Sequence, residues 1–219
     1  MWKLALVATF IPLIAWSQES GESRRFPSPD KKFEYRVVAE EGVIVDNATG
    51  QVVFKIEEAT SGTLAVESGK VLWAPDSRRF AFNYRSGGRY YACNIYELAG
   101  NEWQVLPDLP EEATVVNDMI KRGELRDRKR LGVSKNASRR RIMDEWKVRR
   151  WIDADTVEVF AMSQGSVVID KKTEDVDYIG GAVLFTVKCD NRGGWKITRT
   201  RELSDAELEK MNKEDQDND

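Results

Sequence analysis

Hydrophobic and polar residues alternate strictly along much of the first half of the chain. In residues 33–38 and 80–85, an aromatic or apolar side chain occupies every second position. A period of two puts alternate side chains on opposite faces of a strand, so we expect one buried face and one solvated face. Turn-forming residues follow at 46–50, 86–89 and 191–194, which is typical of hairpins. Short antiparallel strands with regular turns predict a sandwich, a barrel or a propeller.

Two turn segments share a Pro-Asp pair that is followed by basic residues and an aromatic strand. The first reads SPDKKF at residues 28–33, and the second reads WAPDSRRFAF at residues 73–82. Their aspartates, Asp30 and Asp76, are 46 residues apart, a spacing within the range of a propeller blade. Proline restricts the entry to the strand, and the aspartate can accept hydrogen bonds from nearby amides as an Asx-turn. We therefore assign both pairs a structural role.

These segments resemble the repeat of TolB-like and WD-type β-propellers, in which such a turn opens each blade. The resemblance implies blade-like units at residues 26–68 and 69–107, and a degenerate third at 149–203 that keeps a tryptophan and an aspartate but lacks Pro-Asp. Closed propellers have roughly four to eight blades. Three arrangements stay open for the β-rich domain at residues 18–203: an open stack of sheets, a sandwich with similar turns, or a propeller completed by another chain.

A strongly basic segment separates the second unit from the third. Residues 119–150 contain 13 Lys or Arg and four Asp or Glu. We expect this insertion, residues 108–147, to form one helix from Asp108 to Gly132 and a second from Ser134 to Trp146. Its charge predicts an anionic partner, either an acidic protein or an envelope lipid or polysaccharide. The alternative is a solvated excursion that folds back on the chain's own acidic surface.

The candidate contact residues are basic side chains of this insertion and of one hairpin turn. In the insertion they are Lys121, Arg122, Arg126, Arg128, Lys129, Arg130, Arg139, Arg140 and Arg141. In the turn YRSGGRYY they are Arg85, Arg89 and Tyr90, which could hold a sugar or peptide by stacking and cation–π contact. Alternatively, the tyrosines of this turn pack across the strand pair.

Catalytic chemistry finds little support in the sequence. The chain has no histidine, which excludes the usual zinc sites and the Ser-His and Cys-His nucleophiles. It also lacks a P-loop and a nucleophile elbow. The candidates that remain are the carboxylates of IDKKTEDVD, namely Asp170, Glu174, Asp175 and Asp177, which could bind calcium or simply form a polar hairpin loop. We expect no cofactor and no catalytic residue, with a carboxylate- or metal-dependent enzyme as the alternative.

The first residues are typical of a secretory signal peptide. Lys3 precedes an apolar run of 12 residues, and a small-x-small pattern predicts cleavage after Ser17. The alternative, an anchoring transmembrane helix, requires roughly 20 apolar residues. Export to the periplasm or the medium would make nucleic acid an unexpected partner. It would also permit a disulfide between Cys93 and Cys189, although both cysteines fit buried strand positions.

The last residues, 204–219, form an acidic tail. Ser204 and Glu207 fit a capping box, so we expect a short helix there. The whole sequence predicts a mainly β protein with antiparallel, propeller-like sheets in about three blade-like units, a helical insertion and a short C-terminal helix. The predicted function is that of an exported, non-catalytic binding or scaffolding module, with oligomerisation left open.

Overall fold

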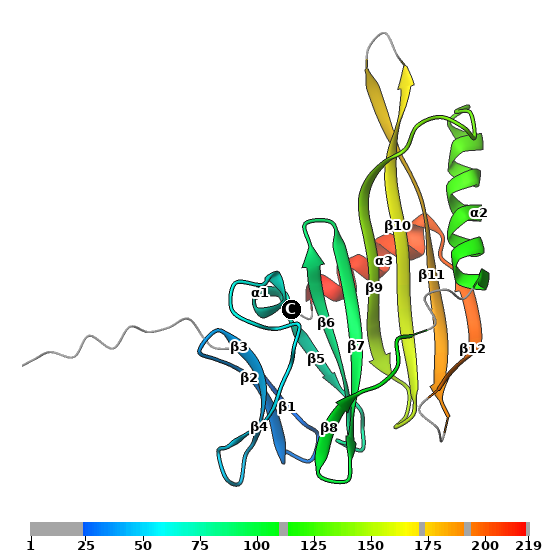
Figure 1. The fold of residues 1–219 in the computed structure, drawn as a ribbon. Coiled ribbons are helices and arrows are strands. Elements are labelled where there is room, and N and C mark those ends of the chain that lie inside the picture. The colour runs from blue at the N-terminus through cyan, green and yellow to red at the C-terminus, as the bar shows by residue number, and fades with distance from the viewer. Residues whose placement is uncertain (1–23, 110–113, 171–173, 191–193, 218–219) are drawn as a thin grey trace, which may run out of the picture.

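The computed structural model describes residues 24–109, 114–170, 174–190 and 194–217 (Figure 1). The predicted signal peptide at residues 1–17 lies outside these ranges. Within them, no helix is both long enough and apolar enough to cross a membrane. The chain forms two sheets and three helices in the described residues, which confirms the mainly β fold with a helical insertion and a C-terminal helix.

The first sheet is a small antiparallel meander at the N-terminal side. Its strands are β1 (Arg25–Pro27), β2 (Phe33–Val38), β3 (Glu41–Asp46) and β4 (Val52–Lys55), paired in chain order. A one-turn helix, α1 (Leu64–Ser68), leads from this sheet to the next. This sheet corresponds to the first expected unit.

The second sheet joins the other two expected units, which therefore do not form separate sheets. Its strands are β5 (Lys70–Trp73), β6 (Arg79–Gly87), β7 (Tyr90–Ala99), β8 (Glu102–Val105), β9 (Arg140–Trp151), β10 (Thr156–Asp170), β11 (Asp175–Cys189) and β12 (Trp195–Glu202). They follow the order β12-β11-β10-β9-β7-β6-β5, with β8 also paired to β7. The junction between the halves is a short parallel contact of two residue pairs between β7 and β9. All other pairings are antiparallel.

Both faces of β5–β7 are buried, where the alternation predicted one solvated face. Phe80 and Phe82 pack against the first sheet in an aromatic core, and the Phe80 ring stacks on Tyr96 with centroids 4.8 Å apart. Between them, Ala81 is fully buried in a second core, together with Ile95. Large and small side chains therefore alternate because the two faces meet different partners.

Two helices cover opposite faces of the long C-terminal strands. Helix α2 (Thr114–Arg130) buries Val116 and Ile120 in the core that contains Val159. Helix α3 (Asp205–Asp217) buries Met211 against the alternate residues of β10 and β11, such as Phe160. In Figure 1, α2 runs beside β11 and α3 crosses behind β9–β11.

The predicted second helix of the insertion is wrong. Residues from Arg140 onward form β9, which pairs with β10 from Val157 to Ser166. Trp146 and Val148, two residues apart, are both buried in the core beneath α2. This period of two and the long partner strand favour a strand over the local helical preference of the segment. Ser134, the expected helix cap, instead closes a turn in which its carbonyl accepts the Ala137 amide at 3.0 Å.

The first helix of the insertion ends where the sequence predicted. Gly132 has a φ of 67°, and its amide donates to the Lys129 carbonyl. The next amide, that of Val133, donates to the Arg128 carbonyl at 2.9 Å. These two bonds form a Schellman cap, which requires a residue in the left-handed region and so favours glycine. Asp108, the predicted cap, and Leu109 are not helical, and the predicted first turn at residues 110–112 lies outside the described ranges.

The Pro-Asp turns adopt the predicted Asx geometry. The Asp30 Oδ1 accepts the Lys32 amide at 3.0 Å, and the Asp76 Oδ1 accepts the Arg78 amide at the same distance. In the third unit, the Asp153 Oδ1 accepts the Asp155 amide at 3.0 Å. The aspartates therefore shape turns, as expected.

Tryptophan indoles tie successive units to each other. The Trp73 Nε1 donates to the Phe26 carbonyl, and the Trp151 Nε1 donates to the Leu72 carbonyl, both at 2.9 Å. Each tryptophan directly precedes its turn, and each accepting carbonyl belongs to the preceding unit. The same kind of indole hydrogen bond thus joins the first unit to the second and the second unit to the third.

The two cysteines are thiols and no disulfide joins them. Cys189 is buried in the core beneath α2, and Cys93 packs against the same core while partly exposed. Burial raises the pKa of the Cys189 thiol. Both therefore act as small apolar side chains, as their strand positions predicted, and the disulfide that export would permit is not formed.

Candidate functional site

The basic residues of the insertion divide between a helix and a strand. Lys121, Arg122, Arg126, Arg128, Lys129 and Arg130 lie on α2, whereas Arg140 and Arg141 begin β9 and Arg139 directly precedes it. They do not form the continuous basic arm that two helices would have presented.

Arg128 is a structural residue and is almost completely buried. Its guanidinium pairs with Glu124 at 2.9 Å and donates to the carbonyls of Ser134 and Ala137, both at 3.0 Å. These bonds fix the loop between α2 and β9. Local sequence does not reveal this burial, because it depends on where the loop after α2 returns to the helix.

Several other basic side chains pair with acidic groups of the same chain. Arg122 and Arg126 lie 3.2 and 3.7 Å from the Glu202 carboxylate at the end of β12. Arg139 contacts Glu124, and Arg141 lies 3.0 Å from Asp144. These pairs match the alternative in which the insertion folds back on its own acidic surface.

The hairpin turn is also engaged internally. The Arg85 guanidinium donates to the Gly87 and Gly88 carbonyls of its own turn. The Arg89 guanidinium donates to the Arg141 carbonyl at 3.1 Å, and Tyr90 pairs with Asp144 in the β7–β9 contact. The turn therefore anchors the junction between the two halves of the sheet.

The candidate metal ligands lie at the tip of the β10–β11 hairpin. Asp170 pairs with Asp175, Glu174 has a φ of 57°, and Asp177 accepts the Tyr178 amide at 2.7 Å. Among the residues that the structure describes, no group of three or more acidic or thiol side chains is placed to hold a metal ion. Residues 171–173 of this loop lie outside the described ranges.

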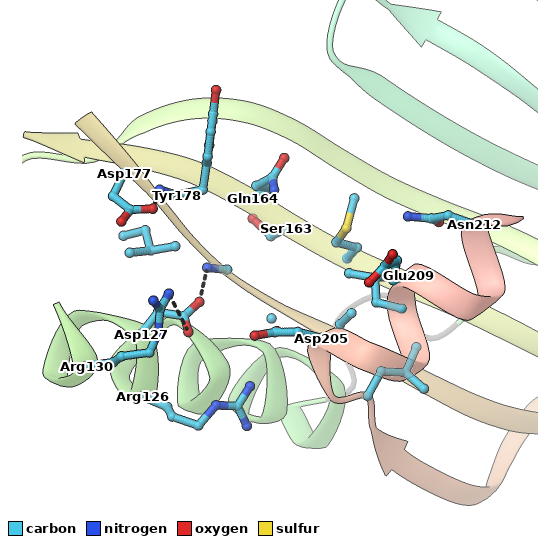
Figure 2. A pocket seen from close by; sticks show the side chains of 17 residues that line it. Arg126, Asp127, Arg130, Ser163, Gln164, Asp177, Tyr178, Asp205, Glu209 and Asn212 are labelled. Carbon is cyan, nitrogen blue, oxygen red and sulfur yellow. Dashed lines mark hydrogen bonds and ion pairs between the residues drawn. The ribbon is translucent and has the colours of Figure 1, made fainter. Parts of the chain in front are cut away.

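The structure brings three of the predicted residues, Arg126, Arg130 and Asp177, to a pocket of about 350 Å³ (Figure 2). We call it the α2–α3 notch, because α2 bounds one side, α3 bounds another, and β11 passes between them. Its apolar lining consists of Met162, Ile179, Ala182, Leu203 and Leu208. Its charged lining consists of Arg126, Asp127, Arg130, Asp177, Asp205 and Glu209.

The notch begins where β12 ends. Just after the end of β12, the Leu203 amide donates a hydrogen bond to the Ala182 carbonyl of β11 at 2.9 Å, and this bond continues the β11–β12 pairing. One step further along the same edge of β11, the Gly180 amide donates to the Asp127 Oδ2 at 3.0 Å (Figure 2). The Asp127 side chain therefore accepts the hydrogen bond that the Gly180 amide would otherwise donate to a neighbouring strand. A charged side chain at this position also disfavours pairing of another strand with the exposed edge of β11.

Glycines allow α2 to approach β11 closely beside the notch. A Cβ atom on Gly181 would lie 2.3 Å from the Ile120 carbonyl oxygen, and one on Gly123 would lie 2.7 Å from the Gly181 Cα. Neither position can hold a larger residue without displacing the helix. This contact sets the width of the notch on its α2 side.

Negatively charged side chains outnumber positively charged ones in the lining of the notch. Four carboxylates face two guanidinium groups, and Arg130 lies 3.7 Å from Asp127 within the lining itself. Asp205 and Glu209 of α3 are exposed, as is the Tyr178 ring at the rim. The notch therefore has an apolar floor and a rim with an excess of negative charge, which suits apolar side chains flanked by basic ones.

Sequence reasoning missed the α3 part of the notch. The Ser204–Glu207 capping box gave the start of the helix, and the structure confirms it: the Glu207 carboxylate accepts the Ser204 amide at 2.9 Å. That signal places Asp205, Leu208 and Glu209 on one helix. It does not reveal that the helix meets β11 and α2.

Other predicted residues line a different pocket. Tyr90, Lys121 and Arg139 face a cavity of about 390 Å³ between α2 and β9. Its polar lining is bound within the chain, since the Ser163 hydroxyl donates to Asp144 at 2.6 Å and accepts the Arg139 guanidinium at 2.7 Å. The notch is thus the pocket with more exposed charged groups.

No protein-family model and no curated protein matches the sequence. Among solved structures, TolB from Acinetobacter baumannii is 13% identical with a TM-score of 0.30, and the match covers 83% of this chain and 44% of that one. A prolyl endopeptidase is 14% identical with a TM-score of 0.30, covering 79% of this chain and 28% of that one. The chain thus spans less than half the length of either protein, and we base no functional conclusion on these likenesses.

Proposed function

We propose that this protein is a non-catalytic binding module that holds a segment of a partner polypeptide in the α2–α3 notch. The observation that carries the proposal is the notch itself, in which an apolar floor is surrounded by charged side chains from α2, β11 and α3. Binding sites for protein segments combine apolar pockets with polar rims in this way.

The chemistry of the notch indicates a basic and apolar partner segment. Arg126 is drawn to Glu202 and Arg130 to Asp127, so part of the positive charge is compensated within the chain. The carboxylates of Asp205 and Glu209 are exposed at the rim, where Glu209 also pairs with Lys213 of the same helix at 3.0 Å. This reverses the charge that the insertion alone predicts, and the anionic partner becomes the competing outcome of the test below.

We further propose that the module acts after export and that its turns derive from a propeller-type repeat. The signal-like N-terminal residues support the first point. The Asx-turns at Asp30, Asp76 and Asp153, together with the paired indole bonds of Trp73 and Trp151, support the second. N-terminal sequencing of the protein recovered from cells would test the first: a start at Gln18 supports export, and a retained Met1 contradicts it.

A random peptide library displayed on phage tests the proposed function. The protein from residue 18 onward is the target, and a variant carrying Asp205→Asn and Glu209→Lys changes the rim. Its matched control carries Glu57→Gln and Glu102→Lys, which change two exposed carboxylates of the N-terminal half and shift the net charge by the same amount. We expect peptides rich in Lys, Arg and apolar residues, bound about three- to tenfold more weakly by the rim variant than by the control.

Two results would contradict the proposal. One is enrichment of acidic peptides, which would support the anionic partner predicted from the basic insertion. The other is equal binding of the selected peptides by the rim variant and its control. Thermal unfolding of both variants establishes that they are folded, so a loss of binding reports on the rim.

A further inference from the structure

A second pocket lies at the junction between the two halves of the long sheet, apart from the α2–α3 notch. It has a volume of about 420 Å³ and receives residues from α1, from β5–β7 and from β9. We call it the junction pocket, and its charged and aromatic lining consists of Lys70, Tyr84, Tyr91, Glu145, Lys147 and Arg149. No residue lines both this pocket and the notch.

The walls of the junction pocket are fixed to each other by hydrogen bonds. The Asn83 side chain on β6 donates to the Val148 carbonyl at 2.7 Å and accepts the Val148 amide at 2.9 Å. The Asn83 side chain thereby binds both backbone groups of Val148, which a neighbouring strand would otherwise bind at the edge of β9. The bond from the Trp151 indole to the Leu72 carbonyl holds the same two walls further along. The pocket is therefore formed before any ligand arrives, which lowers the cost of binding.

Positive charge predominates in this pocket. Among the residues that line it, Lys70, Lys147 and Arg149 are cationic, and Glu145 supplies the one carboxylate. The side chains of Lys147 and Arg149 are only 25% and 19% exposed. Lys147 lies 2.9 Å from Glu145 and Arg149 lies 3.9 Å from Glu214 of α3, so an anion in the pocket would share these cations with carboxylates of the chain. Charges of one sign in a concave, partly buried site concentrate the electrostatic potential and attract counter-ions.

The two tyrosines give the junction pocket a hydrogen-bond donor and rigid aromatic sides. The Tyr84 ring stacks on Phe82 with centroids 5.3 Å apart, and the Arg85 guanidinium lies over Tyr91 at 5.9 Å. Burial raises the pKa of Tyr84 to about 12, with smaller contributions from Glu58 and other nearby groups. Its hydroxyl therefore stays protonated at physiological pH and can donate a hydrogen bond to an anion.

We propose that the junction pocket binds a small organic or inorganic oxyanion, with its carboxylate or phosphate oxygens held by Lys70, Lys147 and Arg149. Charge-assisted hydrogen bonds from lysine and arginine to such oxygens are short and strong. The proposal is independent of the function assigned to the notch, because the two pockets share no residue.

Amide chemical-shift titrations with inorganic phosphate and with citrate test this site, at ionic strength held constant with sodium chloride. We expect saturable shifts confined to Lys70–Trp73 and to the amides of Asn83, Tyr84, Tyr91 and residues 145–149. Saturation by phosphate alone identifies a phosphate site, and saturation by citrate alone identifies a carboxylate site. Shifts that do not saturate, or that spread over the exposed lysines and arginines of α2, would overturn the proposal.

Two neighbouring arginines of β9 provide a matched pair of variants. Arg149 lines the pocket, whereas Arg150 is exposed and pairs with Glu158 at 3.1 Å. Arg149→Gln should weaken binding of the titrated anion about tenfold, and Arg150→Gln should leave it unchanged. Equal affinities of the two variants would contradict the assignment. Tyr84→Phe provides a second test, since it removes the donor and keeps the ring, and it should weaken binding without unfolding the protein.

Discussion

The N-terminal and C-terminal halves of the molecule bury their sheets in different ways. The β1–β4 sheet has strands of three to six residues and packs ring against ring on β5–β8, where the ring centroids of Phe33, Trp73 and Trp103 lie within 6.5 Å of each other. The C-terminal half has two strands of 15 residues each, covered by one helix on each face. Sheet packs on sheet in one half, and helix packs on sheet in the other.

This difference explains where the pockets lie. All three pockets described above include residues of β9, β10 or β11, and none includes a residue of β1–β4. Interlocked rings fill the space between the two sheets of the N-terminal half. In the C-terminal half, β11 passes between α2 and α3, and charged side chains of both helices line the space there (Figure 2). We therefore assign stability to the aromatic core of the first half, and we place the proposed binding sites in the second half and at its junction with β5–β7.

The largest expected effect comes from the aromatic core. Phe80 is fully buried and contacts the rings of Trp73, Tyr96 and Trp103. Phe80→Ala should lower the free energy of unfolding by about 3–5 kcal/mol, because it removes buried area and leaves a cavity. Denaturant unfolding measures the change. Val38→Ala, at a position 45% exposed, is the control and should change little. Comparable losses in both variants would contradict the interlocked core.

The contact between α2 and β11 should be the next most sensitive. Gly181→Ala places a methyl group against the Ile120 carbonyl and should cost about 1–3 kcal/mol, because the helix must shift. It should also weaken peptide binding in the notch. Gly88→Ala is the control, since its Cβ would meet no atom within 4 Å. Thermal unfolding and peptide binding measure the two effects, and an unchanged Gly181→Ala protein would refute the close approach.

Each Asx-turn should contribute less to the free energy of unfolding than the two features above. Asp30 accepts hydrogen bonds from the Lys32 amide and from the Ser28 hydroxyl at 2.7 Å. Asp30→Ala should therefore destabilise the protein by about 1 kcal/mol, the usual contribution of such bonds. Asp30→Asn keeps an acceptor and should restore part of the loss. Chemical denaturation of the two variants measures the difference, and full stability of Asp30→Ala would show that the turn needs only its proline.

The smallest effect concerns the cap of α3 and depends on pH. The Ser204 amide and hydroxyl, with help from Arg201, lower the pKa of Glu207 from 4.5 to about 2. A lowered pKa means that the charged form stabilises the folded state above pH 4.5, and that this contribution is lost as the pH falls toward 2. Circular dichroism should show part of the helicity lost in this window. Glu207→Gln should make the helicity nearly independent of pH in this window. The same pH dependence of helicity in Glu207→Gln and in the natural protein would contradict the cap.

Local chemistry made part of this fold predictable from sequence. The Asx-turns at Asp30 and Asp76, the glycine cap at Gly132 and the capping box at Ser204 each depend on residues a few positions apart. The features that were missed depend on distant partners. The part of strand β9 from Arg140 to Trp146 resembles a helix in sequence, because its basic residues are typical of a helical surface and its partner, β10, comes later in the chain. Arg128 looked like a surface residue because nothing near it in sequence shows that a loop covers it.

The candidate site follows the same rule. Arg126 and Arg130 could be found from the charge of the insertion, but Asp205 and Glu209 lie 75 or more positions away. The negative excess of the notch appears only when both helices are placed on β11. This is why sequence predicts an anionic partner and the assembled notch favours a basic one.

The most direct measurement is amide chemical-shift mapping of the protein with a peptide selected from the library. If the α2–α3 notch holds the partner, the shifts should concentrate on Ile179, Gly180, Leu203 and Leu208, and the rim variant should reduce their saturation. Shifts centred instead on β1–β4, or on the exposed Lys121 and Lys129 of α2, would contradict the account. They would move the binding surface to the half of the molecule that we assign to stability, or to the basic face of the insertion.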